Sequence, residues 1–309
     1  MSLNLIPTKE ITIENTTYCG ANCIVCPRSK YSSNWEHMNT DFFMEIMDQA
    51  AELGVISLDT CGFGDSFMDP EFEKKLRLTK ERYPFVKTYN STTGHLCDEN
   101  RYQWIIETID TLKISIYATS KETYGKIHGE KLNFEKIKKN INRIIETEKS
   151  KRPYIIMLFV VLPENRHEAE QWKEEWESKS DEIMLWKPHN WNGTYPSDSV
   201  TPLAIQSCGR PLHGNPYVHA NGEVSICCFD YNKNLIIGDL RKEKLKDILQ
   251  GEKLERIRSM HKDLTFPENI ICKKCDQTSD RSGALVYSSN THRNAGIITT
   301  HPDLINNML

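Results

Sequence analysis

Residues 18–27 have the sequence YCGANCIVCP, in which Cys19, Cys23 and Cys26 follow the spacing C-x3-C-x2-C. The stretch comes directly after a short apolar run at 10–15 that is typical of a β-strand. Three thiolates this close together can hold three corners of a cubane [4Fe–4S] cluster and leave the fourth iron open for a second molecule. Free core thiols or a zinc site are the alternatives, but zinc takes four ligands and no neighbouring His or Cys completes the set.

The spacing of these cysteines and their position after the first strand resemble the cluster loop of the radical S-adenosylmethionine (SAM) enzymes. The resemblance implies that Cys19, Cys23 and Cys26 bind a [4Fe–4S] cluster whose open iron chelates SAM. It also implies that SAM is split reductively to a 5′-deoxyadenosyl radical, which removes a hydrogen atom from the substrate. Val25 departs from the family pattern, because most relatives have an aromatic residue before the third cysteine.

The composition excludes several other classes of protein. The 309 residues are 38% hydrophobic and 27% charged, with a net charge of -4, so nothing indicates a nucleic-acid partner. No apolar run approaches the roughly 18 residues of a membrane span, and the polar N-terminus lacks the apolar core of a signal peptide. Ten cysteines in a leaderless chain are better explained by metal ligation than by disulfides, and we expect a cytoplasmic protein.

Strand-like runs alternate with amphipathic stretches over the first 190 residues, as in a parallel sheet with crossover helices. The runs lie at 10–15, 55–60, 86–90, 112–117, 154–161 and 182–186. One helix is expected from Thr40, as the N-cap, to Gly54, and another from Asp69, as the cap, with Pro70 in its first turn. A third is expected around 134–144. We therefore expect an α/β fold, and the resemblance implies a partial (β/α)6 TIM-like barrel. The expected domains are the barrel at 1–195, a small α+β domain at 196–280 and a tail at 281–309.

In such a barrel, reactive groups gather on the loops that leave the C-terminal ends of the strands. The run CGFGDS at 61–66 resembles the family's Gly-Gly-Glu-Pro element for the SAM amino group. The third strand ends in a segment similar to the family's Thr-Asn-Gly, near the ribose, and the fourth carries a serine like the one aimed at the SAM carboxylate. The residues that the resemblance assigns to SAM are Gly62, Gly64, Asp65, Ser91, Thr92, Ser115 and His128. Ordinary polar turns are the alternative.

A second set of cysteines follows in the C-terminal third of the chain. It consists of Cys208, Cys227, Cys272 and Cys275. An Asn-Gly turn at 221–222 predicts a β-hairpin that delivers Cys227, and 272–275 form a C-x2-C knuckle. Four cysteines also suit structural zinc. The arrangement resembles the "twitch" extension of radical SAM enzymes, a shortened SPASM domain, which implies one auxiliary [4Fe–4S] cluster and thus two clusters in all.

Two further features bear on the substrate. Cys228 is a spare thiol beside Cys227, and it is either a core residue or a hydrogen-atom donor. The loop His189, Asn190, Trp191 and Asn192 combines polar groups with a flat apolar ring that would suit a polyhydroxylated substrate, although a plain linker turn is the alternative.

The layout is similar to the aminocyclitol and sugar dehydrogenases of the family. We therefore expect an oxidoreductase that dehydrogenates a CH–OH carbon of a sugar, aminocyclitol or sugar nucleotide, with a flavodoxin or ferredoxin type reductant. Three alternatives stay open: a redox-neutral epimerase with Cys228 as the donor, a peptide-modifying enzyme, and a non-enzymatic iron–sulfur electron carrier or sensor. The first strand begins by residue 10, which disfavours an N-terminal leader-binding domain of the kind many peptide-modifying relatives carry.

Overall fold

The structure is a computed structural model that describes residues 5–30, 35–192, 205–278 and 285–290. The chain divides into two compact units, each built from separate stretches of sequence. The first unit consists of Met1–Tyr18, Ser29–Tyr89 and His189–Arg281. The second consists of Cys19–Arg28, Asn90–Pro188 and Ser282–Leu309. The expected domain boundary at 195 and most of the expected tail lie outside the described residues.

Strands and helices alternate along the chain as predicted. The six strands are β1 (Glu10–Ile13), β2 (Ser57–Asp59), β3 (Lys87–Thr92), β4 (Thr111–Ser115), β5 (Tyr154–Val160) and β6 (Glu182–Trp186). The helices between them are α1 (Thr40–Glu52), α2 (Phe72–Arg82), α3 (Glu99–Thr108), α4 (Lys121–His128), α5 (Phe134–Ile145) and α6 (Ala169–Glu177). Each predicted strand is present within a few residues of its predicted limits.

The first unit contains a mixed sheet in the order β3-β2-β1-β7-β8-β9. Its later strands are β7 (Tyr217–Val218), β8 (Glu223–Ser225) and β9 (Ile236–Asp239). Strand β1 pairs in parallel with β2 on one side and with β7 on the other, and β7, β8 and β9 are antiparallel. The predicted hairpin is confirmed, with Gly222 in its turn at a φ of 95° that a glycine adopts without strain.

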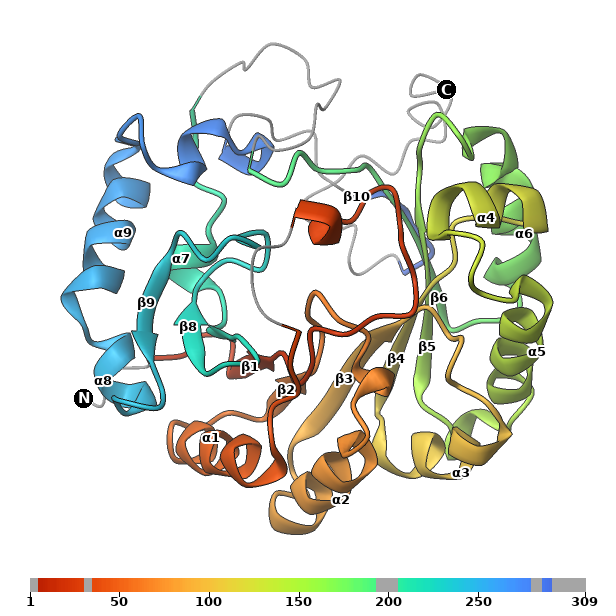
Figure 1. Cartoon of the computed structure of the whole chain (residues 1–309), viewed down its shortest axis with the longest axis horizontal. Coiled ribbons are helices and arrows are strands. Elements are labelled where there is room, and N and C mark those ends of the chain that lie inside the picture. The colour runs from red at the N-terminus through yellow and green to blue at the C-terminus, as the bar shows by residue number, and fades with distance from the viewer. Residues whose placement is uncertain (1–4, 31–34, 193–204, 279–284, 291–309) are drawn as a thin grey trace. The chain divides into compact units, whose positions relative to one another are not determined.

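Helices α1 and α2 lie beside each other in the first unit (Figure 1). Helix α1 buries Phe43, Ile46 and Met47, spaced so that they share one face. The remaining helices of this unit are α7 (Arg210–His213), α8 (Leu245–Leu249) and α9 (Glu252–Asp263). The predicted N-cap Thr40 is wrong by one residue, because the side chain of Asn39 accepts the N–H of Phe42 at 2.8 Å.

The second predicted helix start is also displaced. Helix α2 begins at Phe72, two residues beyond Pro70. Asp69 does not cap it, because its carboxylate contacts the ammonium of Lys75 and accepts from Asn15 at 2.9 Å and from the backbone of Glu71 at 3.0 Å. The local pattern favoured a cap, but a buried ion pair uses the carboxylate instead.

The second unit contains the strand order β4-β5-β6-β10, where β10 (Leu285–Ser288) is antiparallel to β6. Strands β4, β5 and β6 are parallel, with Ile114 opposite Met157 and Met157 opposite Ile183. Helices α4, α5 and α6 lie on one side of these strands (Figure 1). Within the described ranges, no helix is long and apolar enough to cross a membrane.

Candidate functional site

The loop that carries the first three cysteines is attached to the end of α4 in the second unit. The backbone N–H groups of Asn22 and Ile24 donate to the carbonyls of His128 and Ile127, each at 2.9 Å. Gly129 then turns the chain with a φ of 87°, and a Cβ there would lie 3.3 Å from the Cβ of Asn22. The last carbonyls of α4, which have no partner inside a helix, therefore hold the cysteine loop.

Arg28 closes the same loop from its other end. Its guanidinium donates to the carbonyls of Cys19 at 3.2 Å and Ala21 at 3.0 Å. The N–H of Cys26 also donates to the carbonyl of Cys23 at 3.0 Å, which forms a tight turn between two of the cysteines. The loop is thus fixed by its own backbone and by one cation.

The three thiols of this loop are electrostatic neighbours. Burial raises the pKa of Cys23 well above its ordinary value, and the nearby Cys26 and Cys19 raise it further. Burial also raises the pKa of Cys26. Three thiolates so close together need a cation to neutralise them, and a bound iron cluster supplies that charge. The donor set therefore fits the group that the sequence predicts.

His128 lies against this set, at the last residue of α4. Its Nδ1 is 3.1 Å from Sγ of Cys23, and its Nε2 accepts the backbone N–H of Tyr117 at 3.2 Å. Burial lowers the pKa of the ring to about 3, so the imidazole is neutral. Because both nitrogens are engaged, neither is left for the carboxylate of SAM, and we assign the residue another role below.

The other predicted SAM residues of this unit lie at the ends of strands. Ser91 and Thr92 are the last residues of β3, and Ser115 is the last residue of β4. The hydroxyl of Thr92 accepts the N–H of Gly94 at 3.1 Å, and the side chain of Ser115 hydrogen-bonds to that of Tyr117. Their position is the one expected of ligand-binding residues in an α/β barrel, and their contact with SAM stays a prediction.

The glycine loop after β2 belongs to the first unit. A Cβ at Gly64 would lie 2.2 Å from the carbonyl oxygen of Thr16, and one at Gly62 would lie 2.5 Å from Cγ of Glu14. The N–H of Asp65 donates to the carbonyl of Tyr18 at 2.8 Å, and its carboxylate accepts from Phe67 at 3.2 Å. Both glycines are therefore required by close packing against residues 14–18.

Glu14, directly after β1, is a site residue that the sequence did not reveal. It is fully buried, and its two oxygens accept the N–H groups of Phe63 at 2.7 Å and Ala220 at 3.3 Å. The ring of the fully buried His219 lies 3.8 Å from the second oxygen. The carboxylate thus joins the glycine loop to the turn of the β7–β8 hairpin. An acidic residue at the end of an apolar strand was the one available signal.

The four later cysteines gather in the first unit. Burial raises the pKa of Cys272 and of Cys275 to about 12 each, and the neighbouring Cys208 raises both. Burial also raises the pKa of Cys227, to which Cys275 contributes. The carbonyls of Cys272 and Cys275 accept from the hydroxyl of Thr278 at 2.5 and 2.8 Å, which fixes the knuckle. This donor set also fits a bound cluster.

Among the residues that the structure describes, no group of three or more His, Cys, Asp or Glu side chains could hold a single metal ion. A four-iron cluster is much wider than a single ion, so its cysteines need not converge on one point.

Arg210 is a second residue that the sequence reasoning missed. Its guanidinium lies 4.4 Å from the centre of the Phe229 ring and hydrogen-bonds to Cys208. Burial alone would lower the pKa of this side chain, but the thiols of Cys228, Cys227 and Cys208 outweigh it and raise the pKa. The cation is therefore placed to offset negative charge on the second cysteine set. Its only sequence signal was its place two residues after Cys208.

The predicted substrate loop packs beside this set. Asn190 and Asp276 bond to each other reciprocally, backbone to side chain, at 2.7 and 3.2 Å. His189 lies with its ring centre 3.9 Å from that of Phe229 and 4.2 Å from that of Trp191. The side chain of Asn192 donates to the carbonyl of Phe229 at 2.9 Å. The loop is thus attached to the knuckle and to the segment after Cys228, and its contact with a substrate stays a prediction.

Cys228 is exposed, whereas Cys272 and Cys275 are buried. The prediction that it is a core thiol is therefore wrong. Strand β8 ends at Ser225, and Cys228 lies in the turn that follows, which the N–H of Asp230 closes by donating to the carbonyl of Cys227 at 3.2 Å.

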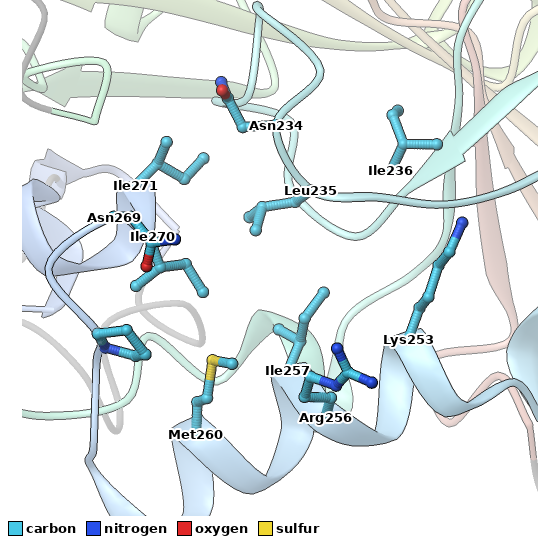
Figure 2. Close-up of a pocket in the computed structure, with 11 residues that line it drawn as sticks. Asn234, Leu235, Ile236, Lys253, Arg256, Ile257, Met260, Asn269, Ile270 and Ile271 are labelled. Carbon is cyan, nitrogen blue, oxygen red and sulfur yellow. The ribbon is translucent and has the colours of Figure 1, made fainter.

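A cavity of about 280 Å³ in the first unit lies apart from these residues. Figure 2 shows Lys253, Arg256 and Met260 of α9 facing two other segments, 234–236 at the start of β9 and 269–271. None of the predicted cysteine or SAM residues lines it, and Ile271 is the lining residue next to a cysteine of the knuckle.

Two family models match the chain. The model of the radical SAM superfamily matches residues 13–175, and the model of an iron–sulfur cluster-binding domain, SPASM, matches residues 208–276. The two matches contain the first and second cysteine sets, respectively.

Individual proteins are similar over most of the chain. The S-adenosyl-L-methionine-dependent 2-deoxy-scyllo-inosamine dehydrogenase of Niallia circulans is 21% identical over 275 residues, which cover 87% of this chain and 93% of that protein. The structure of BtrN with AdoMet and 2-DOIA has a TM-score of 0.62 at 17% identity, covering 90% of this chain and 98% of that one. Streptococcus suis SuiB bound to the precursor peptide SuiA has a TM-score of 0.67 at 15% identity, covering 90% and 72%. The fold is thus the partial TIM-like barrel with an auxiliary domain.

Proposed function

Because this chain belongs to the radical SAM superfamily, we propose that it dehydrogenates a CH–OH carbon of a small polyhydroxylated ring, such as an aminocyclitol, a sugar or a sugar nucleotide. It is an enzyme whose cofactors are [4Fe–4S] clusters and SAM. The observation that carries the proposal is the gathering of four cysteines with the cation of Arg210 in the segment matched by the cluster-binding model. The similarity to an inosamine dehydrogenase supports it.

The two cysteine sets have separate assignments in this proposal. Cys19, Cys23 and Cys26 hold the first cluster and leave one iron for SAM. Gly62, Gly64, Asp65, Ser91, Thr92 and Ser115 are the proposed SAM contacts. Cys208, Cys227, Cys272 and Cys275 hold the auxiliary cluster. When bound, these groups supply a radical that abstracts a hydrogen atom and an acceptor for one electron.

The substrate changes by the loss of two electrons and two protons in total. Its carbon gives up one hydrogen atom, its hydroxyl gives up a proton, and one further electron leaves, so that a ketone forms. Around the second set, the half-buried guanidinium of Arg210 stabilises added negative charge, because opposite charges attract more strongly where water is partly excluded. A positive charge beside the second cysteine set favours an electron acceptor there, which a dehydrogenase needs and a redox-neutral enzyme does not.

The proposed partners are a small carbohydrate-like substrate and a flavodoxin or ferredoxin type reductant. The loop of His189 and Trp191 remains our proposed substrate contact. Its polar side chains Asn190 and Asn192 already bond to Asp276 and Phe229. The aromatic rings are therefore the groups left to shape a substrate surface, as flat apolar faces that suit the CH face of a ring.

An epimerase is a second candidate because Cys228 is exposed beside the second set. An exposed thiol can return a hydrogen atom to a carbon radical, since its S–H bond is weaker than most alkyl C–H bonds. A thiol buried in the core could not reach a substrate radical to do so.

The test is an anaerobic assay with the reduced enzyme, SAM and 2-deoxy-scyllo-inosamine, together with related cyclitols, sugar nucleotides and an unrelated peptide. We expect 5′-deoxyadenosine and a ketone in equal amounts from one of the ring substrates. An inverted alcohol that carries solvent deuterium at carbon would establish the epimerase instead. A product formed only from peptides would refute both.

A further inference from the structure

The imidazole of His128 is held on all sides within the second unit. Its exposed fraction is 1%, and its ring is stacked on that of Tyr124 with the centres 4.5 Å apart. The ring of Tyr117 lies on another side, with the centres 4.7 Å apart. Two aromatic side chains fix the plane of the ring, and the hydrogen bonds of its two nitrogens fix which way the ring is turned within that plane.

The contacts of the two nitrogens determine which one carries the proton. The backbone N–H of Tyr117 is a donor, and it points to Nε2 at 3.2 Å, so Nε2 accepts and carries no proton. An imidazole always keeps at least one N–H, and here that group must be on Nδ1. Nδ1 is 3.1 Å from Sγ of Cys23, so the ring donates an N–H···S hydrogen bond to the thiolate.

The backbone maintains this contact. His128 accepts through its carbonyl from Asn22, the residue before Cys23, and the neighbouring Ile127 accepts from Ile24, the residue after it. Backbone hydrogen bonds of the residues before and after Cys23 therefore hold this cysteine against His128. A movement of the loop relative to α4 would break two backbone hydrogen bonds at 2.9 Å before it separated the ring from the sulfur.

We propose that His128 is a positioning residue that donates from Nδ1 to Sγ of Cys23 and raises the reduction potential of the cluster held there. The proposal rests on the assignment of Cys23 as a ligand, as given above. Hydrogen bonds to ligand sulfurs stabilise the reduced cluster, because reduction adds negative charge that the donor partly offsets. The one-electron reduction that precedes SAM cleavage is thereby brought within reach of a biological donor.

The test compares His128→Phe, which keeps an aromatic ring but has no donor, with His128→Asn, whose amide can reach toward the sulfur. The reduction of the reconstituted enzyme is followed by electron paramagnetic resonance at controlled potentials, and the first cluster is identified as the signal that changes when SAM is added. We expect His128→Phe to lower the equilibrium constant for reduction of the first cluster about tenfold. Its one-electron reduction potential then falls by ~59 mV. His128→Asn should recover part of this loss in reduction potential. Tyr124→Phe, which keeps the ring stacked on His128, is the matched control and should leave the reduction potential unchanged.

An unchanged potential in His128→Phe with full iron content overturns the proposal. If that variant fails to assemble the first cluster, the proposal is tested on the wild-type enzyme instead. With 15N-labelled histidine, the SAM-sensitive signal of the reduced enzyme should show a nitrogen coupling that His128→Asn lacks. No such coupling in the wild type also overturns the proposal. Neither measurement needs a substrate, so the result is independent of whether the dehydrogenase assignment holds.

Discussion

Oε1 of Glu14 accepts the backbone N–H of Phe63 at 2.7 Å, across 49 residues of sequence. Its other oxygen accepts from Ala220, so one buried carboxylate links the glycine loop after β2 to the hairpin that leads to Cys227. The carboxylate therefore provides the acceptor that two buried backbone N–H groups need.

Glu14→Ala should destabilise the enzyme by about 3 kcal/mol, because two buried N–H donors lose their acceptor. Glu14→Gln, which keeps one acceptor oxygen, should lose roughly half as much. Anaerobic urea unfolding of the cluster-loaded protein measures both. Glu45→Ala, at an exposed position of α1, is the control and should unfold like the wild type. Equal midpoints for Glu14→Ala and the wild type would show that the link contributes nothing.

Replacing Cys19, Cys23 and Cys26 together by alanine should leave about half of the roughly eight irons of the reconstituted wild type. SAM cleavage should be lost, because the ligands of the SAM-binding cluster are gone. Iron content and 5′-deoxyadenosine release measure the two effects. Cys97→Ala, a fully buried thiol outside both sets, is the control and should keep both iron and activity. Full 5′-deoxyadenosine formation by the triple variant would refute the first assignment.

Replacing Cys272 and Cys275 by alanine should remove the auxiliary cluster, keep SAM cleavage and abolish the ketone product. The segment around the knuckle should also lose stability, since metal binding there contributes folding energy. Metal analysis, product analysis and thermal unfolding follow the three effects. Zinc in place of iron in the natively purified protein would contradict the cluster assignment.

Cys228→Ser separates the two candidate outcomes. If the enzyme is a dehydrogenase, the variant should turn over at a rate within about twofold of the wild type and give the same ketone, because the exposed thiol takes no part. If it is an epimerase, the variant should still cleave SAM but accumulate side products. Product analysis by mass spectrometry in deuterated water decides, because only the epimerase gives an alcohol with deuterium on the inverted carbon.

Glu168 should give a pH-dependent contribution to stability. Burial alone would raise its pKa, but hydrogen bonds from Ser120, Thr123 and Thr119 outweigh that effect and lower the pKa below its ordinary value of 4.5. These bonds hold the start of α4, the helix that ends at His128. The stabilisation is therefore present above pH 4.5 and is lost as the pH falls through the lowered pKa.

Glu168→Gln should accordingly cost about 1–3 kcal/mol at pH 7, and the difference from the wild type should shrink below about pH 4.5. Urea unfolding over this range measures it. Glu122→Gln, on α4, is the control, because its ion pair with Lys126 is fully exposed and should contribute little to stability. A difference that stays constant down to pH 3 would contradict the role of the charged carboxylate.

The sequence by itself determined the elements and the two cysteine sets. All six strands, the helix at 134–145 and the Asn-Gly hairpin depend on patterns within a few residues of one another, and the cysteine spacing 19, 23 and 26 is local too. Such patterns reflect burial and turn chemistry, which adjacent residues decide. Two of the predictions that failed, Thr40 and Asp69 as helix caps, failed because neighbours distant in sequence used the side chains differently.

Only the tertiary structure decided the partners of side chains. His128 meets Cys23 across 105 residues, and Asn190 meets Asp276 across 86, so no local pattern could indicate either contact. The same holds for Glu14, a buried charge whose partners come from other segments. Arg210 bonds to the nearby Cys208, but the aromatic ring beside its guanidinium comes from a later segment. A buried polar group must find its hydrogen-bond partner wherever the folded chain places one, and that placement depends on the packing of the whole unit.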